Sequence, residues 1–309
     1  GFPVDTMFGT TTPLIADLDN DGDKEIVAVT TERLFPSAGG SRFGMNILIF
    51  NHDGTRFGGW AEGGIQIDYS PVICDLDNDG DLEIIYKADA GICARHHDGT
   101  MVSGWPPRGV GGWNPVQLIA DDLNADGSVE IVYVTSLMRV LGVIDAQGNE
   151  VFLGRYLKGW NSASALVTVD VDNDGTKEIL VGEANCVSVY RMDGSKLDSR
   201  FKIKHNEKLN YLAVYDADGD GSIEIFATLI NKSKVYAWKA NGELLPCWPI
   251  RVYTGRGRDE VDKIALADIN NDGKTEVFTY GDYNCRKIFA FDYQGNPLSG
   301  WPVTLKLEG

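Results

Sequence analysis

The sequence has 309 residues and is acidic, with 45 Asp and Glu against 28 Lys and Arg and a formal net charge of −17. Apolar residues make up 43% of the chain, which is ample for a hydrophobic core. No run of about 18 apolar residues, the length needed to span a bilayer as a helix, is present. The basic residues are scattered and accompany no recognised nucleic-acid-binding motif, so we expect neither a nucleic-acid partner nor a membrane span.

Neither the start of the chain nor its cysteines carry a strong signal. The first residues, GFPVDTMFG, do not resemble a signal peptide, so we expect a chain that is mature, truncated or exported by another route. The five cysteines are an odd number and have no C-x-x-C spacing, which favours neither a disulfide framework nor a thiolate metal site. At least one thiol is therefore unpaired within the chain.

An acidic motif, first seen in ADLDNDGDKEIVAVT at residues 16–30, occurs six times along the chain. Each copy reads D-x-[DN]-x-D-G-x-x-E, and the copies begin 46 to 58 residues apart. A period of this length indicates a repeat architecture and predicts one domain over residues 1–309, although length alone suggests about two. The copies span residues 17–25, 75–83, 122–130, 170–178, 216–224 and 268–276.

The spacing of oxygen-bearing side chains in the motif predicts a calcium site. Alternate residues of a curled loop can converge on one point, and the glycine at position six permits the curl. Calcium accepts more oxygen ligands from protein than magnesium does, so up to six Ca²⁺ ions are expected. The competing interpretation is a set of solvated acidic turns, which six copies in register make less favourable. Positions one, three, five, seven and nine supply 24 of the 45 acidic residues, so the loops account for the acidity of the chain.

The predicted metal ligands are the residues at these five positions of every copy. They are Asp17, Asp19, Asp21, Asp23, Glu25, Asp75, Asp77, Asp79, Asp81, Glu83, Asp122, Asn124, Asp126, Ser128, Glu130, Asp170, Asp172, Asp174, Thr176, Glu178, Asp216, Asp218, Asp220, Ser222, Glu224, Asp268, Asn270, Asp272, Lys274 and Glu276. Calcium sites of moderate affinity fill where calcium is near millimolar, which favours an extracellular or cell-surface location.

The repeat at residues 70–106 shows the expected strand order. An apolar strand at 71–74 enters the acidic loop, a second at 83–88 leaves it, and a third at 91–96 ends in an Asp-Gly turn. A fourth strand is expected to run to Gly104-Trp105-Pro106. Later repeats place third strands at 187–190, 235–238 and 288–291, and no segment shows sustained helical periodicity. The prediction is an all-β fold of four-stranded antiparallel blades, a β-propeller with six blades.

The acidic loop followed by Glu-Ile or Glu-Val, with an aromatic strand and Gly-Trp-Pro behind it, resembles the FG-GAP and VCBS-type calcium-binding repeats related to the integrin α-subunit head. The resemblance implies a calcium-binding propeller and a role in cell adhesion or carbohydrate binding. Integrin-type loops usually end in aspartate, whereas this chain has glutamate at position nine. That head also has seven blades, so a seventh, incomplete or missing blade is the alternative. Gly1-Phe2-Pro3-Val4 resembles Gly300-Trp301-Pro302-Val303 and either seals the ring or belongs to a longer array.

Strand parity predicts where a ligand would bind. The acidic loops and the glycine turns share one face of the blades, and the links between repeats and the second-to-third-strand loops, including residues 32–43, form the other. The aromatic, amide and cationic residues of that second face are the predicted ligand-binding residues: Tyr69, Trp113, Asn114, Trp160, Asn161, Arg256 and Arg258. The alternatives are indoles that plug gaps between blades, as expected for Trp60, Trp105, Trp248 and Trp301, and arginines in solvated loops.

Three functions are compatible with the sequence. The first is a calcium-stabilised module that binds a glycan or an extracellular protein. The second is an enzyme similar to propeller-shaped rhamnogalacturonan lyases, which are larger and bring histidine and basic residues to a cleft. The third is a spacer within a larger surface protein. We predict no catalytic residues, because His52, His96 and His97 lie in turns, His205 lies in a linker, and no nucleophile or phosphate motif is present.

Overall fold

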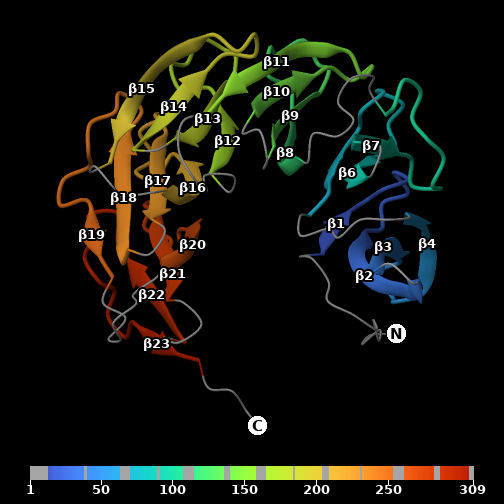
Figure 1. Cartoon of the computed structure of the whole chain (residues 1–309). Coiled ribbons are helices and arrows are strands. Elements are labelled where there is room, and N and C mark those ends of the chain that lie inside the picture. The colour runs from blue at the N-terminus through green and yellow to red at the C-terminus, as the bar shows by residue number, and fades with distance from the viewer. Residues whose placement is uncertain are drawn as a thin grey trace. The chain divides into compact units, whose positions relative to one another are not determined.

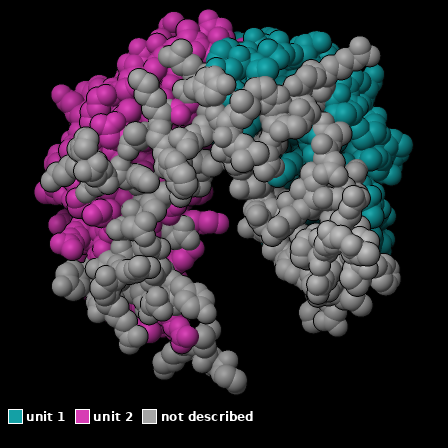
Figure 2. All heavy atoms as spheres, in the orientation of Figure 1, with its two compact units in different colours: residues 1–156 teal, residues 157–309 magenta. Residues whose placement is uncertain are grey.

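The computed structural model describes most of the chain as a succession of antiparallel β-sheets (Figure 1). Within the described residues there is no helix, and so none that could cross a membrane. The chain divides into two compact units, residues 1–156 and 157–309 (Figure 2), and the prediction of a single domain stays a prediction. The described residues are 13–37, 40–62, 70–88, 91–106, 115–135, 140–157, 165–183, 185–203, 209–229, 232–252, 261–281 and 286–305.

The first unit contains three sheets, each built from strands in chain order. The first sheet has β1 (Leu14–Ala16), β2 (Glu25–Ser37), β3 (Gly40–Phe50) and β4 (Arg56–Glu62). The second has β5 (Val72–Cys74), β6 (Glu83–Ala88) and β7 (Gly91–Arg95), followed by an isolated bridge between Arg95 and Met101. The third has β8 (Pro115–Asp121), β9 (Glu130–Thr135), β10 (Val140–Ile144) and β11 (Glu150–Tyr156).

The second unit contains three further sheets of four strands. The fourth sheet has β12 (Leu166–Val169), β13 (Glu178–Glu183), β14 (Cys186–Tyr190) and β15 (Lys196–Lys202). The fifth has β16 (Leu209–Tyr215), β17 (Glu224–Leu229), β18 (Lys234–Lys239) and β19 (Ile250–Arg251). The sixth has β20 (Val261–Ala267), β21 (Glu276–Gly281), β22 (Lys287–Phe291) and β23 (Val303–Thr304).

The sheets repeat the predicted order of elements. The acidic loop joins the first strand to the second, and a glycine turn follows the third strand, leading to a fourth strand in five sheets and to the isolated bridge at Met101 in the second, so both connections lie at the same end of the sheet. The second strand begins at the glutamate that ends the acidic loop. In β6, β9, β13 and β17 all residues are buried, because both faces of these strands are covered. The loop glutamates of these four sheets are therefore carried on fully buried strands.

The hydrophobic core lies between neighbouring sheets of the same unit. Tyr86 of β6 packs with Ile49 of the first sheet, whereas Ile85, the next residue, packs with Tyr133 of the third. In the second unit Ile225 packs toward the fourth sheet and Phe226 toward the sixth. Successive residues of a strand point to opposite faces, so each inner sheet supplies both of its faces to a core.

Neighbouring sheets are also joined by side chains that hydrogen-bond to the next glycine turn. The indole Nε1 of Trp105 donates to the carbonyl of Ala146 at 3.0 Å, and that of Trp248 donates to Tyr293 at 3.1 Å. Arg200, which has no tryptophan nearby in its repeat, donates from Nη1 to Ala240 at 3.1 Å. These contacts confirm that Trp105 and Trp248 lie between blades. Trp60 also lies there, with its ring centroid 6.0 Å from that of Tyr86.

Two expectations about the strands were wrong. In the second, fifth and sixth sheets the fourth strand does not run to Gly-Trp-Pro or Cys-Trp-Pro; it makes one isolated bridge and turns, and in the fifth and sixth sheets it resumes as β19 or β23 beyond the proline. Trp105 and Trp248 are buried here against the next sheet, and the proline that follows cannot donate to the ladder. Of residues 32–43, expected as a loop, 32–37 and 40–43 instead extend the hairpin of β2 and β3.

Candidate metal centres

Each acidic loop is closed by hydrogen bonds from its backbone to its own carboxylates. The N–H of the glycine at position six donates to Oδ2 of the aspartate at position one in all six loops, at 2.9 to 3.2 Å. The N–H at position seven donates to Oδ1 of the aspartate at position five, at 2.8 to 2.9 Å. The local sequence therefore curls the loop around its acidic side chains.

The curl requires two residues in the left-handed region of backbone space. Position six is glycine, with φ of 82° to 98°. Position four is Asn or Gly in five loops, but in the third loop it is Ala125, at φ 61°. Alanine is disfavoured in this region because its Cβ approaches the following carbonyl, whereas asparagine tolerates it.

The glutamate at position nine holds the loop to the sheet. Its Oε2 accepts a hydrogen bond from the N–H at position two in every loop, at 2.8 to 3.0 Å, and the donors are Leu18, Leu76, Leu123, Val171, Ala217 and Ile269. All six glutamates are at most 3% exposed. The second oxygen, Oε1, has different surroundings from loop to loop: it contacts His96 in the second loop and Asn270 in the sixth.

Four loops bring the carboxylates at positions one, three and nine together. In each group one oxygen per residue lies within 4.8 Å of the others. The groups are Asp17, Asp19 and Glu25; Asp75, Asp77 and Glu83; Asp170, Asp172 and Glu178; and Asp216, Asp218 and Glu224. Hard oxygen donors converging in this way are the ligand set that calcium takes.

Three buried carboxylate oxygens in these groups have no hydrogen-bond partner: Oδ1 of Asp19, Oδ1 of Asp75 and Oε1 of Glu178. A buried, ionised oxygen without a donor is costly, whereas a divalent cation at the same point would satisfy it. Glu178 is fully buried, so no solvent compensates its Oε1. The side chains present therefore fit a bound Ca²⁺ ion.

Positions five and seven are placed differently from positions one, three and nine. Oδ1 of the aspartate at position five already accepts from the N–H at position seven. At position seven itself, the Asp23 and Asp81 carboxylates face His52 and His97, each at 3.7 Å. Lys274, at position seven of the sixth loop, has an ammonium and no side-chain oxygen, so only its main-chain carbonyl could contribute a ligand.

The third and sixth loops have asparagine at position three, so they carry one negative charge fewer there, and the amide donates to neighbouring carboxylates. Nδ2 of Asn124 donates to Asp126 at 3.0 Å. Nδ2 of Asn270 donates to Asp272 at 3.1 Å and to Oε1 of Glu276 at 2.9 Å. Because an N–H already donates to these oxygens, binding of a cation is less favourable in the third and sixth loops.

The glutamates of the first five loops are held at raised pKa values. Burial is the largest cause for Glu25, Glu83, Glu130, Glu178 and Glu224; nearby aspartates add repulsion, and the N–H donated from position two opposes both. These effects raise the pKa of Glu224 to about 7. Without a cation, the folded protein therefore favours protonation at these positions.

Neighbouring loops in the same unit are linked through the backbone. The N–H of Leu82, at position eight of the second loop, donates to the carbonyl of Leu18, at position two of the first, at 2.9 Å. Thr275 and Ala217 make the same bond between the sixth and fifth loops, also at 2.9 Å. The residue whose N–H binds one glutamate thus also anchors the next loop through its carbonyl.

Sequence reasoning missed two features of the site. His96, expected as an exposed turn residue, has only 24% of its side chain exposed and reaches Glu83. In the fourth sheet Glu183 is buried and accepts from Ser188 at 2.6 Å, Tyr190 at 3.0 Å and Lys196 at 2.7 Å. Burial raises the pKa of Glu183, but these hydrogen bonds outweigh it and lower the pKa below its ordinary value. Both features depend on contacts between strands, which the linear pattern does not show.

The predicted ligand-binding residues lie outside the described part of the chain. They are Tyr69, Trp113, Asn114, Trp160, Asn161, Arg256 and Arg258. Of the cysteines, Cys74, Cys93, Cys186 and Cys247 are described, and Cys74, Cys186 and Cys247 are free thiols.

The fifth and sixth acidic loops, with the sheet between them, match a known family model. Residues 216–279 contain an FG-GAP-like repeat. This confirms the FG-GAP resemblance in that part of the chain. No curated protein matches the sequence significantly.

Solved structures that resemble the chain are β-propellers. The biofilm matrix protein Bap1 of V. cholerae is similar over 95% of this chain and 59% of its own, with a TM-score of 0.56 and 17% identity. BBS1N, solved in complex with ARL6DN, is similar over 94% and 83%, with a TM-score of 0.60 and 12% identity. Virginiamycin B lyase from Staphylococcus aureus is similar over 91% and 89%, with a TM-score of 0.54 and 13% identity. At these identities the likeness shows the fold, and the prediction of an all-β propeller of antiparallel sheets is confirmed.

The left-handed alanine gives a first prediction. Ala125→Asn should stabilise the protein by about 1 kcal/mol, because asparagine adopts φ near 60° at lower cost. Asn173→Ala, at the same position of the fourth loop, should destabilise it by a similar amount. Urea unfolding in excess calcium measures both changes, and equal stability of all three proteins would contradict the explanation.

The raised glutamate pKa values give a second prediction, for protein kept in chelator. The folded state keeps protons on these glutamates at pH values where the unfolded state has already released them. The stabilisation that results is fully present below the ordinary glutamate pKa of about 4.5 and, for Glu224, is lost as the pH rises through about 7. The melting temperature of chelated protein should therefore fall between pH 5 and pH 8. Saturating calcium should remove or reverse this trend, since the ion takes the place of the protons. A melting temperature of the chelated protein that is constant or rises over this range would contradict it.

Proposed function

We propose that this protein is a calcium-stabilised recognition module that acts outside the cytosol and binds a glycan or an extracellular protein. The observation that carries the calcium part is the set of buried, unpartnered carboxylate oxygens at Asp19, Asp75 and Glu178. Each lies in a group of three convergent carboxylates, and the arrangement recurs in four loops. A protein with these oxygens needs a divalent cation to reach its full stability.

The loops are proposed to bind up to six Ca²⁺ ions with unequal affinity. The first, second, fourth and fifth loops offer three converging carboxylates, whereas the third and sixth offer two and an amide that already donates to its neighbours. We expect the four carboxylate-rich loops to fill first. Such sites are filled where calcium is near millimolar, which supports an extracellular or cell-surface location.

The proposed binding face is the one away from the acidic loops. In the described sheets the acidic loops and glycine turns occupy one end, so the links between repeats are free to carry a ligand site at the other. The similarity to Bap1, which is named as a biofilm matrix protein, supports a role in an extracellular assembly.

Calcium removal tests the structural part of the proposal. Each site should contribute about 2.7 kcal/mol when calcium is a hundredfold above its dissociation constant, so chelation should lower the melting temperature substantially. Glu178→Gln should remove one calcium ion from the native mass spectrum, since it removes the charge at a fully buried ligand. Glu243→Gln, at an exposed residue outside the acidic motifs, is the matched control and should leave the count unchanged. Protein that binds no Ca²⁺ in excess would refute the proposal.

A glycan array probed with the whole chain in calcium tests the ligand. Binding that the double variant Trp113→Ala, Trp160→Ala abolishes, with an unchanged melting temperature, would support the recognition module and its face. Binding that the variant leaves intact would contradict the assigned face. Release of unsaturated product from acidic polysaccharides would favour the lyase, and binding to neither glycans nor extracellular proteins would favour the spacer.

A further inference from the structure

The second repeat carries a histidine where its glycine turn faces its acidic loop, and no other repeat has a histidine at that position. The glycine turn between the third and fourth strands begins with a residue whose carbonyl accepts from the turn glycine in all six repeats. This residue is Asn51, His96, Asp145, Arg191, Lys239 and Asp292 in turn. Only the second repeat therefore places an imidazole beside its acidic loop from this position.

The imidazole of His96 is held by a buried carboxylate. Its Nδ1 lies 3.0 Å from Oε1 of Glu83, whose side chain is fully buried and whose other oxygen accepts from Leu76 at 2.8 Å. Once Glu83 is ionised its carboxylate only accepts, so the proton of a neutral His96 then lies on Nδ1 and the lone pair lies on Nε2. Metal-binding histidines are commonly oriented in this way, with one nitrogen donating to a carboxylate and the other on the metal.

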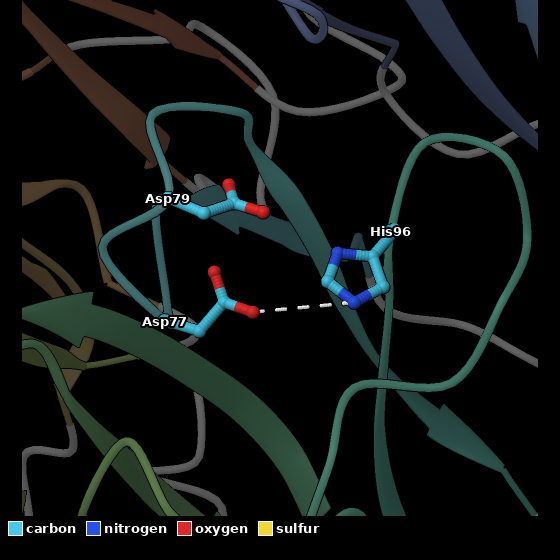
Figure 3. Close-up of side chains that lie close together, drawn as sticks. All are labelled: Asp77, Asp79 and His96. Atoms are coloured by element: carbon cyan, nitrogen blue, oxygen red, sulfur yellow. Dashed lines mark ion pairs between the residues drawn. The ribbon is translucent and has the colours of Figure 1, made fainter.

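The free nitrogen lies beside Asp77 of the loop, and Asp79 lies close to the ring. Nε2 of His96 lies 4.0 Å from Oδ2 of Asp77, and Figure 3 shows the ring facing the carboxylates of Asp77 and Asp79. One ligand atom from each of these three residues lies within 4.8 Å of the others. In the same loop Oδ1 of Asp75 is buried without a partner, so the loop has more ligand atoms than its hydrogen bonds use.

We propose that Asp77, Asp79 and His96 form a site for a first-row transition metal ion of the zinc class, distinct from the calcium trio of the same loop. An imidazole nitrogen with carboxylate oxygens suits zinc and related ions, whereas calcium takes oxygen ligands almost exclusively. Asp77 belongs to both groups, and two divalent ions sharing one carboxylate at this distance repel each other. The transition metal ion therefore displaces calcium from the second loop alone.

The rival explanation is that His96 only orients Glu83 for calcium. The two explanations differ in what His96→Asn does. This variant gives the second repeat the residue that the first repeat has at the same place, Asn51, so the turn is expected to keep its fold. Under the rival explanation the variant weakens calcium binding, and zinc has no specific site for the variant to alter. Under the proposal the variant weakens zinc binding.

Calorimetric titration of tag-free, chelator-treated whole chain with Zn²⁺ tests the site. We expect one tight equivalent in the unaltered protein, at least tenfold weaker binding in His96→Asn, and no change in His97→Asn, whose imidazole faces Asp81 instead. Co²⁺ should give a visible absorption band that is lost with His96→Asn. Native mass spectra in excess calcium should lose one Ca²⁺ when one Zn²⁺ binds.

Three outcomes would overturn the inference. Equal zinc affinity of the unaltered protein and His96→Asn would show that the imidazole is not a ligand. An equal loss in His97→Asn would assign the binding to the turn as a whole. An unchanged calcium count at saturating zinc would disprove displacement. The titration starts from calcium-free protein, so its result does not depend on whether the calcium proposal is correct.

Discussion

The structure of every repeat depends on one carboxylate that has two roles. The glutamate at position nine binds the N–H at position two through Oε2, which fixes the acidic loop onto the second strand, while Oε1 is left for whatever the loop encloses. Because this carboxylate is buried, its charge must be balanced nearby. The position-nine glutamate thus links the folding of the sheet to the binding of a cation, and it is long enough to make both contacts from the first residue of the strand.

The six loops share this framework but differ in how the second oxygen is balanced. In the fourth loop Oε1 of Glu178 has no partner, in the sixth an asparagine amide donates to Glu276, and in the second an imidazole contacts Glu83. A repeat that is uniform in backbone geometry therefore presents chemically distinct sites. The differences come from position three of the loop and from the first residue of the glycine turn, which lie far from each other in sequence.

The loops are not independent of each other. The residue at position two of one loop donates to its own glutamate and, in two places, accepts from position eight of the next loop, as Leu18 does from Leu82 and Ala217 from Thr275. Tryptophan or arginine side chains connect the second sheet to the third through Ala146, the fourth to the fifth through Ala240, and the fifth to the sixth through Tyr293. An ion that orders one loop is expected to restrict its neighbour within the unit, because these bonds join adjacent sheets.

The sequence by itself determined the features that repeat: strand order, the left-handed curl imposed by Gly at position six, the convergence of acidic side chains and the propeller fold. These are local, since each is set by residues within a few positions and is then reinforced six times. The tertiary structure decided which oxygens are left without a partner, that His96 meets Glu83, that Glu183 gathers Ser188, Tyr190 and Lys196, and that the fourth strand breaks at the tryptophan. Each of these is a contact between strands or sheets, and its existence depends on register and packing that residue spacing along one strand does not encode.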